Sequence, residues 1–419
     1  MKKLDGGIIV QKYGGSSVAN PERIKAVAKR VSLCRKKGYD VVVVVSALGD
    51  TTDELVSLAA LVSKNPPERE LDMLMSTGEQ VSVALLAMAL HELGQDAISF
   101  TGAQVGIITD SSHTNAKILD VNTKRIKKEL KRHKIVIVAG FQGTSLEQEI
   151  TTLGRGGSDM TAVALAKVLK ASMCEIYTDV KGVYTADPRI VSNARKLESI
   201  SYEEMLEMAS LGAQVMQARS MEVAGKFNVP MKVRSSFSSE EGTVITKEGK
   251  VMEEVLVRGI TVNKSEAKVT VCDVPDKPGE ASRLFEKLAK AGINVDMIIQ
   301  NVSRTLMTDI SFTVEKKDLQ KVQKIISKII KEISAQGVQY DKNIAKVSVV
   351  GIGMRSHSGV AAKMFHILAS KKINIKMIST SEIKISCVVS EQEADKAVIA
   401  LHKAFGLGKK RTKKMANKT

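Results

Sequence analysis

The sequence predicts an α/β protein in which a mostly parallel sheet, sandwiched by helices, is followed by a smaller repeated unit. Short β-branched runs alternate with helix-patterned segments over about the first 240 residues, as expected for parallel strands joined by crossover helices. The second observation is an internal repeat that begins at residue 269. The third is the length of 419 residues, which exceeds what one ordinary core supports and so predicts several domains.

The first elements follow from local patterns. Asn20 is a favoured N-cap, Pro21 fits the first helical position, and Gly38 ends the apolar stripe, so a helix is expected between them. Five runs rich in Val and Ile predict strands: Ile8–Val10, Val41–Val45, Ile135–Val138, Glu175–Thr178 and Met231–Arg234.

A repeat occupies the carboxyl-terminal part, after a polar stretch that starts at Ser235. The run from Val269 to Gln300 matches the run from Val347 to Thr380 once two residues are added. Each copy predicts a strand, a helix and two strands, and the first copy adds a helix over Leu319–Ser334. One helix per copy is too little to cover such a sheet, so we expect the copies to pair, and two of them can share one continuous sheet.

The predicted domain boundaries follow from these patterns. We divide the chain into an α/β domain at 1–240, a linker at 241–268, repeat units at 269–340 and 341–408, and a basic tail at 409–419.

Composition argues against several classes of protein. The longest uninterrupted apolar run, Val83–Leu90, is far too short to span a membrane, and Asp5 with two glycines interrupts any signal-peptide core. We therefore predict a cytoplasmic protein without membrane attachment. Four scattered cysteines and six histidines have no disulfide or zinc spacing, so neither a disulfide framework nor a zinc site is predicted.

The formal net charge of +17 is concentrated in a few stretches, chiefly Lys124–Lys134 and Lys409–Lys418. We interpret the first as a solvated helix face and the second as a disordered tail. Only 3% of the residues are aromatic and no Trp is present, so stacking surfaces for bases are lacking and no nucleic-acid partner is expected.

A glycine-rich run with one arginine and nearby aspartates predicts a site that handles phosphate. Arg155 and Asp159 lie in TTLGRGGSD, and Asp179 and Asp187 lie in YTDVKGVYTADPR. Glycines let backbone N–H groups approach an anion, and a guanidinium fits a carboxylate or phosphate. No G-x-x-x-x-G-K-[ST], H-R-D or D-F-G motif is present, which excludes P-loop and protein-kinase sites.

Taken singly, each of these residues has a simpler interpretation. Lys12 could be a solvated lysine after the first strand, and Ser158 could cap a helix. Glu79 could be a favourable acid in the first turn of a helix, and Asp187 before a proline could form a turn.

Six segments taken together resemble the aspartate kinases. They are QKYGGSSV at Gln11–Val18, SALGDTTDEL at Ser46–Leu55, STGEQ at Ser76–Gln80, GFQG, TTLGRGGSD and YTDVKGVYTADPR. The repeats resemble ACT regulatory domains, so the resemblance covers nearly all of the chain except the tail. It implies an amino-acid-kinase fold followed by two ferredoxin-like ACT domains. It also implies phosphorylation of the L-aspartate side chain by MgATP to give 4-phospho-L-aspartate and ADP, the first step of lysine, threonine and methionine biosynthesis.

The resemblance also implies residue roles. The implied catalytic residues are Lys12, which would contact the phosphates, and Asp159, which would orient Lys12. The implied ATP-binding residues are Lys12, Gly14, Gly15, Ser46, Thr178, Asp179, Tyr184, Asp187, Arg189 and Gln214. The implied aspartate-binding residues are Ser46, Asp50, Thr51, Thr52, Glu79, Arg155, Gly156, Gly157 and Ser158. The implied regulatory residues are Asp276, Gly279, Ala281, Asn294, Val295, Asp296 and Gln300.

Control by lysine, threonine or both is implied for the ACT pair, together with a homo-oligomer formed through ACT pairing. Met252 would allow a separately made regulatory chain. Gln214 replaces a lysine that is frequent in the family, and the second copy lacks the acid of the first. The rival hypotheses are a glutamate or nucleoside monophosphate kinase, a non-catalytic amino-acid sensor or RNA-binding regulator, and repeats that serve dimerisation alone.

Overall fold

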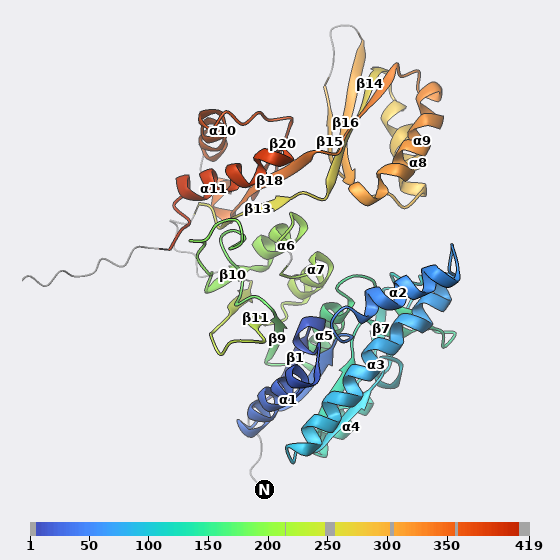
Figure 1. Ribbon diagram of the computed structural model, residues 1–419, viewed down its shortest axis with the longest axis vertical. Coiled ribbons are helices and arrows are strands. Elements are labelled where there is room, and N and C mark those ends of the chain that lie inside the picture. The colour runs from blue at the N-terminus through green and yellow to red at the C-terminus, as the bar shows by residue number, and fades with distance from the viewer. Residues whose placement is uncertain (1–5, 214, 248–255, 302–305, 357–358, 410–419) are drawn as a thin grey trace, which may run out of the picture. The chain divides into compact units, whose positions relative to one another are not determined.

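The computed structural model describes residues 6–213, 215–247, 256–301, 306–356 and 359–409. These residues form two compact units (Figure 1). The first unit comprises residues 1–183, 196–210 and 214–251, and the second comprises residues 184–195, 211–213 and 252–419. The predictions for Gln214, Met252 and the tail beyond residue 409 lie outside the described residues.

An eight-stranded sheet forms the core of the first unit, in the order β10-β12-β11-β9-β1-β2-β6-β3. All of its neighbouring strands are parallel except β11 and β12. The strands are β1 (Ile8–Tyr13), β2 (Asp40–Val45), β3 (Ala97–Phe100), β6 (Ile135–Ala139), β9 (Met173–Thr178), β10 (Ser199–Ser201), β11 (Met231–Ser235) and β12 (Thr243–Thr246). The five predicted strands are confirmed, and they are contiguous in the sheet as β11-β9-β1-β2-β6.

The helices of the first unit either cover the faces of this sheet or pack on the helices that do (Figure 1). They are α1 (Pro21–Lys36), α2 (Thr51–Val62), α3 (Glu68–Glu92), α4 (Lys124–Lys131), α5 (Gly157–Leu169), α6 (Tyr202–Ser210) and α7 (Ala218–Phe227). The apolar stripes of α1 and α3 share a core with alternate residues of β1, β2 and β6, such as Tyr13 and Val43. Side chains alternate along a strand, so residues between these, such as Lys12, face the opposite side, where α5 packs on β1.

Two local predictions for helices are confirmed. The Asn20 side chain accepts a hydrogen bond from the Arg23 N–H at 3.0 Å, and α1 ends one residue before the C-cap Lys37. Helix α4 buries Ile126 and Leu130 while its lysines remain outside that apolar stripe, which confirms a solvated basic face.

Helix α3 is the one helix among the described residues that is long and apolar enough to cross a membrane. Half of its most apolar stretch is nevertheless buried inside the protein. It packs against α1, β3 and β6 as a core helix. A small second sheet, in the order β5-β4-β7-β8, lies beside its amino-terminal half. The strands of this sheet are β4 (Ile107–Thr109), β5 (Ile118–Val121), β7 (Gln142–Thr144) and β8 (Ile150–Thr152).

The second unit contains the two repeat copies, each with a four-stranded antiparallel sheet. The first copy consists of β14 (Glu266–Pro275), α8 (Glu280–Lys290), β15 (Val295–Gln300), β16 (Met307–Glu315), α9 (Leu319–Glu332) and β17 (Gly337–Asp341). The second consists of β18 (Ile344–Val350), α10 (Val360–Ser370), β19 (Met377–Thr380), β20 (Lys384–Ser390) and α11 (Ala394–Ala404). The predicted strand, helix, strand, strand order is confirmed in both copies, and α11 is a second added helix that the sequence reasoning missed.

The stretch 241–268, for which a linker is predicted, contains strand β12 and strand β13 (Gly259–Asn263). Strand β13 pairs antiparallel with β18 and completes the second copy, in the place that β17 takes in the first. The two copies of one chain do not share a continuous sheet among the described residues: the order β15-β16-β14-β17 is separate from β13-β18-β20-β19. The copies instead pack through a small apolar cluster that includes Met297 and Met377.

Candidate active site

Lys12 lies within β1, not after its end as predicted, and its Nζ is 2.7 Å from Asp159 Oδ1. Pairing of β1 with β2 and β9 holds the backbone of Lys12 on both sides, opposite Val44 and Ile176. The two charged side chains are only 14% and 8% exposed. A solvated lysine is therefore the wrong interpretation, and the ion pair fixes a cation at the α5 face of the sheet.

A glycine turn brings the amino terminus of α5 to the same place. Gly156 is the N-cap residue with φ +73°, in the left-handed region that favours glycine. A Cβ at Gly156 would lie 1.8 Å from Gln217 Cγ, so a side chain is excluded there. The helix begins at Gly157, and the alternative that Ser158 is its N-cap is wrong. Free N–H groups at this helix end can bind an anion.

Ser158 has a different partner, Ser46. Their hydroxyl oxygens are 3.0 Å apart, which joins the first turn of α5 to the loop after β2. The loop after β2 lies at the carboxyl end of a strand of the parallel sheet, the usual place for ligands in this architecture. The turn before α5 follows β8 of the small second sheet.

Glu79 lies in the middle of α3, so the interpretation as an acid in a first helical turn is wrong. Its side chain is buried, and Oε1 accepts a hydrogen bond from the Ala47 N–H at 3.1 Å. Oε2 has no hydrogen-bond partner among the described residues. Burial raises the pKa of Glu79 to about 7, although backbone hydrogen bonds partly oppose this shift. The site thus contains a carboxylate with one oxygen free for a cationic ligand.

These residues line one cavity of about 940 Å³, near the upper end of the usual range for small-molecule sites, about 300–1,000 Å³. The predicted residues that line it are Lys12, Gly14, Gly15, Ser46, Thr52, Glu79, Arg155, Gly156, Gly157, Ser158, Asp159, Thr178 and Asp179. Asp50 and Thr51 do not occur among the described lining residues; Asp50 precedes α2 and Thr51 begins it.

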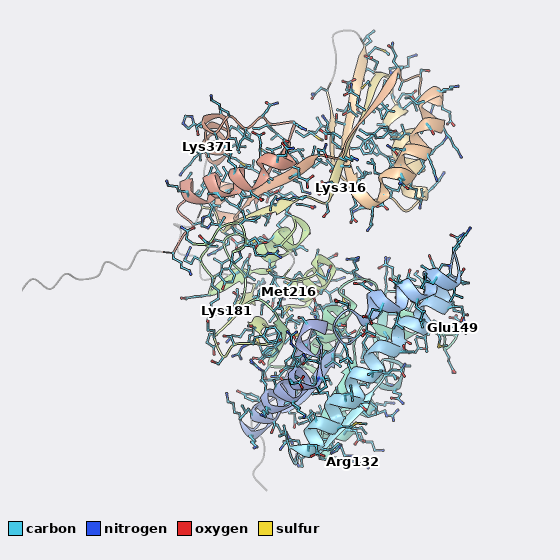
Figure 2. The ribbon with its side chains drawn as sticks, in the orientation of Figure 1. Arg132, Glu149, Lys181, Met216, Lys316 and Lys371 are labelled. Atoms are coloured by element: carbon cyan, nitrogen blue, oxygen red, sulfur yellow. The ribbon has the colours of Figure 1, made fainter. Side chains whose placement is uncertain are left out.

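The cavity also has walls that the sequence reasoning missed. They include Lys64, Asn65 and Pro66 between α2 and α3, Thr114 and Phe141, and Val215, Met216 and Gln217 before α7, of which Met216 is labelled in Figure 2. The sequence gives a weak signal for the first group, because a lysine before Asn-Pro-Pro marks a loop. Phe141 belongs to the GFQG segment, but no role was predicted for it. Thr114 and residues 215–217 lie outside the motifs, and only the fold brings them to the cavity.

The remaining predicted nucleotide residues, Tyr184, Asp187 and Arg189, belong to the second unit. Asp187 Oδ1 accepts a hydrogen bond from the Arg189 N–H at 2.9 Å, so the turn interpretation is confirmed for Asp187. The Arg189 guanidinium also binds this carboxylate at 2.7 Å and holds the pKa of Asp187 below its usual range.

The predicted regulatory residues surround α8 and β15. Gly279 caps α8 with φ +100°, Asp276 and Ala281 flank it, and Asn294, Val295 and Gln300 lie before or within β15.

Asp296 is already engaged by a lysine from the other copy. Lys346 of β18 is almost fully buried and forms ion pairs with Asp296 and with Glu266, the latter at 2.5 Å. Burial lowers the pKa of Lys346, but the two carboxylates outweigh this effect and the net shift is upward. Burial raises the pKa of Glu266, with Lys346 opposing it.

Comparison with known proteins agrees with this geometry. A model of the amino acid kinase family matches residues 7–235, and a model of the ACT domain matches residues 269–329 and 347–405. The chain is 52% identical over 406 residues to the aspartokinase of Corynebacterium glutamicum, with 96% of each chain covered. It is 53% identical over 403 residues to the aspartate kinase of Pseudomonas fluorescens, with 96% of this chain and 98% of that one covered.

Solved structures show the same relationship. The R-state of E. coli aspartokinase III in complex with aspartate and ADP matches with a TM-score of 0.80 at 25% identity, covering 95% of this chain and 99% of that one. The T-state of that protein, with lysine and aspartate, matches with a TM-score of 0.74 at 26% identity and the same coverage.

The fold and the site define a phosphotransferase with a parallel sheet, a lysine–aspartate pair and two regulatory repeats, which confirms the predicted fold class. The chain belongs to the amino acid kinase family, and within it to the aspartokinases that carry ACT domains.

Proposed function

We propose that this aspartokinase transfers the γ-phosphoryl group of ATP to the side-chain carboxylate of L-aspartate through the cavity at the Lys12–Asp159 pair. The observation that carries the proposal is the 2.7 Å ion pair itself, because it fixes a cation beside the Gly14–Gly15 turn. Phosphoryl transfer depends mainly on positioning and charge neutralisation. Lys12 supplies the positive charge for the transferring group, and Asp159 keeps its ammonium in place.

The amino-acid acceptor is oriented by groups of opposite charge. Glu79 Oε2 is available for the substrate ammonium, and Arg155 with the free N–H groups at the start of α5 is suited to the α-carboxylate. An aspartate side chain has a pKa of about 3.9 and is ionised at neutral pH, so its attack on the phosphorus needs no general base.

We assign the nucleotide phosphates to the Gly14–Gly15 end of the cavity, with Thr178 and Asp179 beside it. Further contacts to the nucleotide are proposed only because of the family resemblance. They involve Tyr184, Asp187, Arg189 and Gln214. Magnesium in such sites is held mainly by phosphate oxygens, water and one or two carboxylates. Asp179 and Asp159 are carboxylates that fit this requirement, and the ion would neutralise charge on the phosphates.

The experiment is an ADP-release assay with aspartate, glutamate and UMP as acceptors. Aspartate alone should support turnover, and Lys12→Met should abolish it in a protein that still folds. Lys29→Met, at an exposed lysine of α1, is the matched control and should retain activity. Turnover with glutamate or UMP but not with aspartate would overturn the proposal, as would full activity of Lys12→Met.

We further propose feedback control by lysine, threonine or both at the first ACT copy, in a cytoplasmic homo-oligomer formed through ACT pairing. The exposed backbone at Gly279 is suited to the effector carboxylate and Asp276 to its ammonium. Asp296 is available only in part, because an effector ammonium would share it with Lys346.

The nucleotide segment 184–195 offers a physical route for this control. Ala186, Val191 and Ala194 are buried in the same apolar core as β18, β20 and α11. The Thr185 hydroxyl accepts one hydrogen bond from the Arg195 N–H at 3.0 Å and pairs with His402 Nε2 at 2.9 Å. A rearrangement of the second copy would therefore displace Tyr184 and Asp187 on either side of Thr185. Titration of ADP formation with lysine and threonine, separately and together, tests the effectors.

A further inference from the structure

Asp72 is a fully buried carboxylate on α3 that the proposed chemistry does not use. Oδ1 accepts a hydrogen bond from the Thr152 hydroxyl at 2.5 Å, and Oδ2 lies 2.7 Å from His113 Nδ1. The Thr114 N–H is 3.1 Å from both oxygens. A buried charge costs several kcal/mol unless its bonds are satisfied, so a residue needed only for packing would be apolar.

The partners of Asp72 belong to the two segments that form one wall of the cavity. Thr152 ends β8 and leads into Gly154 and Arg155, while His113 and Thr114 belong to the loop between β4 and β5. The Ala116 N–H donates to the Thr152 carbonyl at 2.9 Å, so the two segments also bind each other. Thr114, Gly154 and Arg155 all line the cavity. Asp72 thus accepts hydrogen bonds from both segments, 113–116 and 152–155, which together form the Arg155 wall of the cavity.

A second charged group holds the same wall from the other side. Arg219 of α7 donates to the carbonyls of Leu153 at 2.9 Å and Ala116 at 2.7 Å, and to Asn115 Oδ1 at 3.3 Å. Gly154 has φ +75°, and a Cβ there would lie 3.0 Å from Asn115 Oδ1 and 3.1 Å from the Thr114 carbonyl oxygen. This close approach leaves little freedom for the backbone that leads into Arg155, as long as Asp72 and Arg219 keep their hydrogen bonds.

Asp72 and Glu79 are seven residues apart on α3, which is about two helical turns, so both side chains leave the same face of the helix. At one end of this face, Asp72 accepts a hydrogen bond from Thr152 of the Arg155 wall. At the other end, Glu79 presents to the cavity its Oε2 atom, which has no hydrogen-bond partner among the described residues. The distance between the group suited to an α-carboxylate and the group suited to an ammonium is therefore set by one rigid helix.

We propose that Asp72 is a positioning residue for the amino-acid substrate: through Thr114 and Thr152 it holds the Arg155 wall at a fixed separation from Glu79. The inference rests on the proposed function, because it assigns the wall to aspartate recognition. It predicts selective damage to the use of aspartate, since the Gly14–Gly15 end of the cavity has no contact with Asp72 among the described hydrogen bonds.

The test measures KM and kcat for both substrates in Asp72→Asn, Thr152→Val and Thr152→Ser. Displacement of the Arg155 wall should raise the KM for aspartate about tenfold or more in Asp72→Asn and Thr152→Val. A misplacement of about 1 Å can lower the rate of an enzyme by about 100-fold, so a change of this size is expected from a small shift. The KM for ATP should stay within about twofold of the wild-type value. Thr152→Ser keeps the hydroxyl and should restore a near wild-type KM. Glu92→Gln, at an exposed acid near the end of α3, is the control.

Several outcomes would overturn the positioning role. One is a lower melting temperature in Asp72→Asn and Thr152→Val with an unchanged KM for aspartate, which leaves a structural role alone. Another is a parallel rise of both KM values. If Asp72→Asn does not fold, the comparison of Thr152→Val with Thr152→Ser decides. Failure of the proposed function is distinguishable, because the wild-type chain would then form no ADP with aspartate.

Discussion

Substitution of Glu79 by glutamine should stabilise the first unit at alkaline pH while it weakens aspartate binding. A carboxyl group with a pKa raised on folding is favoured in its neutral form, so its ionisation above the unfolded pKa costs stability. Burial raises the pKa of Glu79 from 4.5 to about 7. The cost therefore begins near pH 4.5, grows as the pH rises to about 7, and is constant above that value.

The magnitude follows from the two pKa values. Each pKa unit corresponds to about 1.4 kcal/mol, so Glu79 costs about 3 kcal/mol at pH 8 and about 1 kcal/mol at pH 5. Glutamine keeps an acceptor for the Ala47 N–H but carries no charge. The variant should therefore gain about 3 kcal/mol at pH 8, or about 6–12 °C in melting temperature for a unit of this size.

Calorimetry of the wild type and Glu79→Gln at pH 5 and pH 8 measures this gain, with Glu92→Gln as the exposed control on the same helix. The same preparations should show a higher KM for aspartate in Glu79→Gln, because the ammonium loses its counter-charge. Equal melting temperatures for Glu79→Gln and the wild type at pH 8 would refute the argument that Glu79 is held at an energetic cost.

Four further outcomes are expected. Lys12→Met and Asp159→Asn should each lower kcat by about 100-fold or more, because both act on the charge at the transferring phosphate. In the wild type the KM for aspartate should fall about tenfold from pH 6 to pH 8, as Glu79 ionises and becomes competent to bind an ammonium. Thr185→Val should raise the KM for ATP and weaken effector inhibition, without changing the KM for aspartate. Lys346→Met should destabilise the second unit by about 3 kcal/mol, since it leaves buried Glu266 without its cation.

Each of these outcomes has a result that contradicts it. Full turnover of Asp159→Asn would remove the orienting role of that carboxylate. A KM for aspartate that is flat between pH 6 and pH 8 would mean that Glu79 does not contact the substrate. Parallel changes in both KM values would refute the selective role of Thr185. A melting temperature of Lys346→Met equal to that of the wild type would show that water replaces the cation.

The parts of the fold that were predictable are those with strong local signals. The Val and Ile runs of β1, β2 and β6 are buried on both faces, and this makes them uninterrupted in the sequence. Strands β4, β7 and β8 have only three residues each, too few for a pattern. Strand β13 pairs with β18, about 90 residues later in the chain, and its place therefore depends on a partner that local pattern cannot identify.

The site was predictable only where several motifs could be compared with a family at once. Lys12 and Asp159 are separated by 147 positions, and their ion pair depends on the contact of β1 with α5. Asp72 was missed because it stands in the charged segment ERELDM at the start of a helix, where acids are common for electrostatic reasons. Lys64 was missed because an isolated lysine in a loop is usually solvated.

Helix α3 explains why two buried acids can be retained so close together. Its amino-terminal half buries Asp72 and Glu79, whereas its carboxyl-terminal half buries Val83, Leu86 and Leu90 against α1 and the sheet. Each of the three apolar side chains contributes about 1.5–3 kcal/mol when fully buried, which is enough to offset the cost of about 3 kcal/mol at Glu79. The apolar half thus anchors a helix whose other half lines the cavity, and a neutral replacement of Glu79 would favour stability over binding.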